Sequence, residues 1–148
     1  DRALELTRTF LNKMELEDSP EKTKISHFSK GFDFIGFTIK NKSVKMRSKS
    51  KEKFKDTIRD ITIRSYNLDQ EVIKKLNRVI RGTVNYFSSK FCTMKFAFRK
   101  ADEWIRKRIR CMKYKRIKIQ DNRRLPNTRI KKMGLLSCFD LYRARLHC

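Results

Sequence analysis

The residues best suited to chemistry are basic, and they recur at regular spacing between residues 99 and 113. Arg106, Arg110 and Lys113 follow an i, i+4, i+7 pattern, so in a helix they form a cationic ridge about 10 Å long at 1.5 Å per residue. Phosphates along a nucleic-acid duplex are spaced on a similar scale, and neutralising them releases counterions. The spacing predicts binding to a nucleic-acid backbone, on a ridge broadened by Arg99, Lys107 and Arg108.

The bulk charge points to the same class of partner. The chain of 148 residues carries a formal net charge of +23, and 37% of its residues are charged. Solubility does not need so large an excess, so a polyanion is the expected partner. Aromatic residues near basic ones can stack on unpaired bases or pack in the core; these are Tyr66, Tyr86, Phe87 and Tyr114.

Catalytic and metal-binding patterns are missing from the sequence. Asp56 and Asp60 are one helical turn apart among lysines, which indicates surface ion pairs. There is no glycine-rich phosphate loop and no paired histidine, so we expect this chain alone to be inactive as an enzyme. The four cysteines form no C-x-x-C pair, so a zinc site is not expected. With no long apolar run, we expect a cytoplasmic protein, in the bacterial cytosol or an organelle, with no membrane partner.

These basic residues must be positioned by two kinds of element. Residues 31–39 (GFDFIGFTI) predict a strand with Phe32 and Phe34 on one face, and with Ile35, Phe37 and Ile39 on the other. Gly36 in its middle indicates a bulge or a close approach by another backbone or a ligand. We expect residues 22–28 to pair with this strand as a hairpin, and Val44 and Met46 to lie in a third short strand.

The rest of the pattern is helical. Apolar residues at helical spacing predict helices at residues 2–16, 51–64, 67–87 and 94–114, with a cap from Ser48 or Ser50 and another from Asn67 or Asp69. Residues 115–128 read as irregular, and 128–146 as a last short helix. Gly82 inside a helix indicates close helix packing or close approach of a ligand. The expected fold is α+β and mostly α, with an N-terminal helix and a small antiparallel hairpin before a basic bundle of three main helices.

Four motifs in order resemble the group II intron reverse transcriptases. Lys22-Thr23 followed by Phe34-Ile35-Gly36-Phe37 is similar to the end of their polymerase region. Residues 48–59 are similar to their first thumb helix. Residues 76–87 (LNRVIRGTVNYF) resemble the family signature "LNxxLRGWxNYF", with Thr83 in place of tryptophan, and residues 102–110 (DEWIRKRIR) resemble "LDxWIRxRLR".

The resemblance implies a division of the chain and roles for its residues. Residues 1–47 would end the palm, 48–120 would form the thumb or maturase-specific domain, and 121–148 would be a basic extension. Lys22 would assist the leaving pyrophosphate, and Phe34, Ile35, Gly36 and Phe37 would form the primer grip. Residues expected to bind nucleic acid are Lys49, Lys51, Arg59, Arg64, Asn77, Arg81, Asn85, Tyr86, Arg99, Arg106, Lys107, Arg110 and Lys113.

The implied partners are group II intron RNA and an RNA–DNA template–primer. Because the chain begins at Asp1 without a methionine, we expect a longer parent whose fingers and palm precede it. That parent would need Mg²⁺, whereas this chain carries no cofactor site. The alternatives are a freestanding basic RNA-binding protein, or part of a retron or defence-associated reverse transcriptase.

Overall fold

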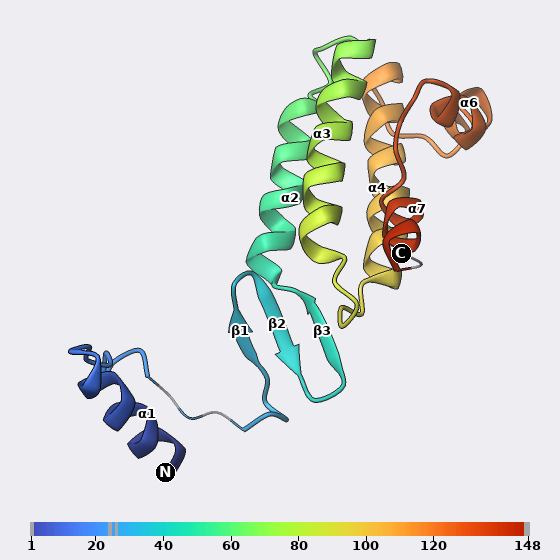
Figure 1. Cartoon of the computed structure of the whole chain (residues 1–148). Helices are drawn as coiled ribbons and strands as arrows, with labels where there is room; N and C mark the ends of the chain where they lie inside the picture. The colour runs from blue at the N-terminus through green and yellow to red at the C-terminus, as the bar shows by residue number, and fades with distance from the viewer. Residues whose placement is uncertain (1, 24, 26, 147–148) are drawn as a thin grey trace.

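The computed structural model describes residues 2–23, 25 and 27–146, and its architecture is α+β and mostly α, as predicted (Figure 1). A three-stranded antiparallel sheet, in the order β1-β2-β3, precedes the main helices. The elements are α1 (Arg2–Lys13), β1 (Phe32–Phe34), β2 (Phe37–Lys40), β3 (Ser43–Met46), α2 (Ser48–Ile61), α3 (Gln70–Phe87), α4 (Lys95–Tyr114), α5 (Asp121–Arg124), α6 (Asn127–Lys132) and α7 (Cys138–Leu146).

The N-terminal helix forms as predicted but stands apart from the bundle (Figure 1). It ends at Lys13 and buries none of its residues, so its apolar stripe is open, with Phe10 67% exposed. The strand predicted at 22–28 is wrong for Thr23, Ile25 and His27, which lie in no strand; residues 24 and 26 lie outside the described residues. The partner strand of the sheet therefore comes from elsewhere.

That partner comes from within the 31–39 stretch, which folds back on itself. Ile35 and Gly36 have φ angles of +43° and +80°, and two successive residues with positive φ reverse the chain in a tight hairpin turn. Phe34 pairs with Phe37, and Phe32 pairs with Ile39. Directly paired residues share a face of a sheet. The prediction of one strand with these aromatic residues on opposite faces is therefore wrong.

The resulting sheet has one apolar and one polar face. In β3, Val44 pairs with Ile39 and Met46 with Phe37, which confirms the third strand and extends the apolar face. Phe37, Val44 and Met46 pack against the core of the bundle. On the opposite face Asp33 accepts a hydrogen bond of 2.6 Å from Thr38 Oγ1 and pairs with Arg47 Nε at 2.8 Å. The sheet is thus covered by the bundle on one side only.

Helices α2, α3 and α4 form the predicted three-helix bundle around one core. Asp69 caps α3, because its Oδ1 accepts a hydrogen bond of 2.8 Å from Val72 N. The predicted serine cap of α2 is wrong: Arg47 is the cap residue, and Ser50 instead donates to the Gly36 carbonyl at 3.3 Å. The fully buried core side chains include Ile58, Leu76, Ile80, Val84, Phe98, Ile105, Ile109 and Met112.

Gly82 faces open space. A Cβ added there would meet no heavy atom within 4 Å outside its own local helix. The prediction of close helix packing at this position is therefore wrong, and approach of a ligand stays a prediction.

The C-terminal segment is more ordered than predicted. The residues expected to be irregular contain α5, and Gly134, with φ +90°, separates α6 from α7 where one helix was expected. Both differences follow from tertiary packing, because Leu125, Ile130, Cys138 and Tyr142 are buried in the same core as the bundle. Helix α7 lies against α3 and α4 (Figure 1).

One buried carboxylate fixes the start of α7. Asp102 of α4 is 6% exposed and accepts hydrogen bonds from Ser137 Oγ at 2.7 Å, Cys138 N at 2.7 Å and Phe139 N at 3.1 Å. It thereby satisfies backbone N–H groups that a helix leaves free at its N-terminus. Burial raises the pKa of the Cys138 thiol, and the Asp102 charge beside it raises it further.

We predict that Asp102→Ala lowers the free energy of unfolding by about 2–3 kcal/mol, because buried donors of α7 lose their acceptor. Urea denaturation measures this loss. Glu103→Ala, a surface change one residue away, is the control and should stay within about 0.5 kcal/mol. Equal effects of the two substitutions would show that the Asp102 contacts do not hold α7.

Candidate nucleic-acid interface

The hairpin tip is held against the bundle by Tyr86. Its hydroxyl donates to the Ile35 carbonyl at 2.8 Å, and its ring stacks on Phe37 with centroids 5.6 Å apart. The Gly36 carbonyl accepts from Arg47 N at 2.8 Å. Of the four predicted primer-grip residues, Phe37 thus packs inward, whereas Phe34 and Ile35 are exposed at 58% and 64%. The positive φ of Gly36 is explained by the turn itself.

A groove lies beside this tip, between the hairpin and helices α2 and α3. It encloses about 380 Å³, and its lining includes Gly36, Lys53, Thr57, Gly82 and Tyr86. Because Gly82 has no side chain and Thr83 has a small one, the backbone of α3 is accessible from the groove. An extended polymer can therefore approach the backbone of α3 here, with Lys53 beside it.

The α4 ridge is only partly free. Arg110 donates from Nε to the Leu125 carbonyl at 2.9 Å and from Nη2 to Asn127 Oδ1 at 2.6 Å, so it also holds the C-terminal segment. Burial lowers the pKa of Arg110 below its usual value, and the nearby Arg106 charge lowers it further. Lys113 and Lys107 are exposed. The helix therefore presents cations, but Arg110 has a structural task as well.

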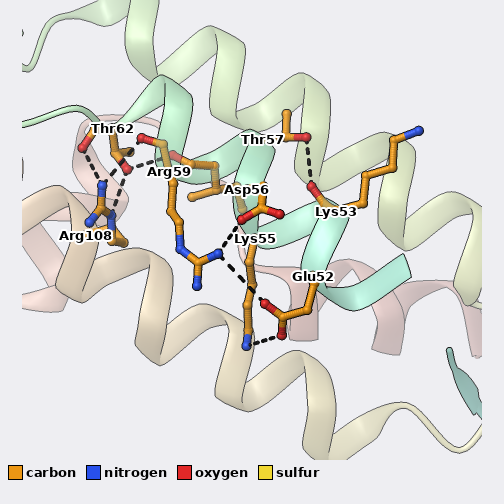
Figure 2. A network of polar contacts seen from close by, with 9 residues as sticks. Glu52, Lys53, Lys55, Asp56, Thr57, Arg59, Thr62 and Arg108 are labelled. Atoms are coloured by element: carbon orange, nitrogen blue, oxygen red, sulfur yellow. Dashed lines mark hydrogen bonds and ion pairs between the residues drawn. The ribbon is translucent and has the colours of Figure 1, made fainter. Parts of the chain in front are cut away.

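Two other arginines are used within the protein (Figure 2). Arg108 donates to Thr62 Oγ1 at 3.0 Å and to the Thr62 carbonyl at 2.8 Å, where it caps the C-terminal end of α2. These acceptors orient its guanidinium towards α2 without balancing its charge, and its part in the ridge stays a prediction. Arg59 pairs with Asp56, as predicted for that carboxylate, and lies 3.8 Å from Glu52. Its charge is largely balanced on α2.

The side chain of Asn77 is also hydrogen-bonded within the protein. Its Nδ2 donates to the Gly134 carbonyl at 2.8 Å, and its Oδ1 accepts from Leu136 N at 2.9 Å. Both ends of the carboxamide thus bind the loop between α6 and α7. The structure speaks against its assignment to nucleic acid, because the group that would read RNA already joins α3 to the C-terminal segment.

Most of the remaining predicted residues lie at the surface. Lys22 is exposed in a turn after α1, and its catalytic role stays a prediction. Phe87 is buried, so it cannot stack on bases, whereas Tyr66 is 58% exposed. Arg99 packs over the Phe139 ring at 4.5 Å and keeps an exposed surface. Besides the ion-paired Arg59, the exposed predicted contacts are Lys49, Lys51, Arg64, Arg81, Asn85, Tyr86, Arg99, Lys107 and Lys113.

The side chains of residues 2–23, 25 and 27–146 form no metal cluster. Within these ranges no three His, Cys, Asp or Glu side chains gather as a metal site. No helix in that part of the chain is long and apolar enough to cross a membrane.

Comparison with known families identifies a match to part of this chain. The family described as "Group II intron, maturase-specific domain" matches residues 51–130, more than half of the chain. This chain belongs to that family. The matched range begins in α2, spans α3 and α4, and ends in α6, so it includes most of the helices that carry the exposed cations. A comparison with curated proteins gave no match.

Within this maturase-specific domain, the structural role of the polar motif residues was not predicted from the sequence. Asn77 and Asp102 lie in the two segments that resemble family signatures, and both bind the segment after α6. Their partners are 35 or more residues away. A signal was available in Asp102, which falls on the apolar side of α4, four residues after Phe98 and three before Ile105.

The ion pair of Asp121 predicts acid sensitivity. Its carboxylate accepts from Arg116 Nη2 at 3.0 Å, and this hydrogen bond holds the pKa of Asp121 below its usual value, against the opposing effect of burial. The pair therefore stabilises the fold above the ordinary carboxyl pKa and is lost as pH falls through the lowered one.

We predict that Asp121→Asn lowers the urea midpoint at pH 6 and that the difference from wild type shrinks towards about pH 3. Asp60→Asn, at an exposed carboxylate with no ion pair among the described residues, is the matched control and should show neither effect. A pH-independent difference for Asp121→Asn would contradict the assignment.

Proposed function

We propose that this maturase-specific domain binds the RNA of a group II intron through its exposed lysines and arginines and so assists splicing. The observation that carries the proposal is the family match over residues 51–130 of a chain with a net charge of +23. Many cations on that part of the surface, Lys107 and Lys113 among them, have no ion-pair partner in the described ranges. Unbalanced charge of this kind is what phosphate binding uses.

Affinity for a structured group II intron RNA should depend steeply on salt. With six or more phosphate contacts, affinity falls about a thousandfold between 50 and 200 mM salt, as filter binding can measure. Lys107→Glu with Lys113→Glu should reduce the log–log slope by about two, since each contact contributes about 0.9.

The control carries the same charge change at Lys40 and Lys42, around the β2–β3 turn at the other end of the molecule (Figure 1). It should leave more of the slope intact. An affinity that does not change with salt would contradict the proposal. An equal reduction of the slope in both double variants would show that total charge alone, and no particular surface, drives the binding.

We also propose that, in a longer reverse transcriptase, the groove beside the hairpin tip holds the template–primer duplex. The specific support is the open α3 wall at Gly82, which costs a helix about 1 kcal/mol relative to alanine and packs against nothing in the structure. Ile35 projects at the groove edge and Lys53 supplies a cation. The polymerase chemistry, with its Mg²⁺, would belong to the other domains of such a parent.

Substitution at Gly82 tests the groove. Gly82→Leu should leave the fold at least as stable, because leucine is the better helix former by about 0.8 kcal/mol. It should weaken binding to an RNA–DNA duplex about tenfold in an anisotropy titration, since its side chain fills the groove. Gly82→Ala is the graded control, with a smaller loss. Unchanged duplex affinity for Gly82→Leu would place the duplex elsewhere.

A further inference from the structure

A large open cavity lies far from the hairpin, against the C-terminal half of α4. It encloses about 630 Å³, which is within the usual range for small-molecule sites. Helix α4 forms one wall, and the loop after it, α5 and the start of α6 supply the other lining residues. The docking of the chain after α4 creates this cavity, because α4 by itself supplies only one of its walls.

The cavity carries an excess of positive charge. Arg106, Lys107, Arg110 and Lys118 line it, and none has an ion-pair partner among residues 2–23, 25 and 27–146. Its two carboxylates are paired with other cations: Glu103 with Lys100 at 3.1 Å, and Asp121 with Arg116 at 3.0 Å. An anion is therefore the missing partner.

Arg110 is placed to receive that anion. Two neutral acceptors, the Leu125 carbonyl and Asn127 Oδ1, fix its guanidinium without balancing its charge. Arg106 lies one helical turn before Arg110 on the same wall, and its side chain makes no hydrogen bond within the described part of the chain. Two neighbouring guanidiniums that are partly removed from water repel each other, and a phosphate between them would relieve this.

Two exposed isoleucines also line the cavity. Ile117 is 56% exposed and Ile119 is 87% exposed, although aliphatic side chains of this size favour burial. The phosphates of a duplex backbone would contact only the cations and leave these two isoleucines exposed to water. An unpaired nucleotide carries both a phosphate for the arginines and a flat base that packs on apolar side chains.

We propose that this cavity receives one unpaired RNA nucleotide, with its phosphate on Arg106 and Arg110 and its base against Ile117 and Ile119. The inference rests on the proposed binding of intron RNA and specifies which part of a structured RNA this surface takes. It predicts a preference for RNA with a bulged or looped-out nucleotide over continuous duplex.

The test compares two RNA hairpins that differ by one bulged nucleotide, in anisotropy titrations with the whole chain. Wild type should bind the bulged hairpin about tenfold more tightly, a gain of about 1.4 kcal/mol, which a single base contact can supply. Ile119→Ser should remove this preference and leave affinity for the paired hairpin within about twofold. Ile63→Ser, at an exposed isoleucine in the α2–α3 connection, is the control and should keep the preference.

Each outcome decides one point. Equal and tight binding of both hairpins by wild type would overturn the inference while leaving RNA binding intact. A preference that survives Ile119→Ser would also overturn it. Absence of binding to either hairpin would reject the proposed function itself. As a further arm, a nucleoside 5′-monophosphate should compete better than inorganic phosphate, and equal competition would show an anion site without base contact.

Discussion

The hydrogen bonds that Asp102 accepts at the start of α7 are the contact on which the rest of the domain depends. A carboxylate buried to this degree is costly unless donors surround it, and its donors all belong to the C-terminal segment. Asn77 binds the same segment from α3. The docked segment then buries Ile130, Cys138 and Tyr142 and completes the core. The cavity beside α4 exists because of this docking.

The sequence predicted the helices well, because the features that determine a helix lie close together along the chain. The apolar spacing of α3 and the Asp69 cap lie within a few residues of each other. The prediction of one strand over residues 31–39 failed because the hairpin turn uses Ile35 beside Gly36. Isoleucine is not a residue that favours turns, so the apolar residues of the two strands looked like one continuous strand. The tasks of Asn77, Arg108 and Asp102 could not be predicted, since their partners lie 35 to 59 residues away and only the fold brings them together.

The polar residues of the bundle thus divide into two groups. Asn77, Asp102 and Arg108 hold elements together, and Arg110 does so while also lining the cavity. Residues such as Arg81, Lys107 and Lys113 have exposed side chains and no ion pair among the described residues. The groove at the hairpin tip and the cavity against α4 share no lining residue and lie towards opposite ends of the bundle (Figure 1). The two proposed binding sites are therefore separate on the surface of the domain.

The central claim is that the Asn77 motif position builds the domain while its exposed basic neighbours bind RNA. Measuring unfolding free energy and intron-RNA affinity together for Asn77→Ala and Arg81→Ala, both on α3, tests this most directly. The account predicts that Asn77→Ala loses about 2 kcal/mol of stability and keeps its affinity while folded. Arg81→Ala should stay within about 0.5 kcal/mol in stability and lose about 0.9 from the salt slope. The reverse pattern, with Asn77→Ala stable but weak in binding, would contradict the account.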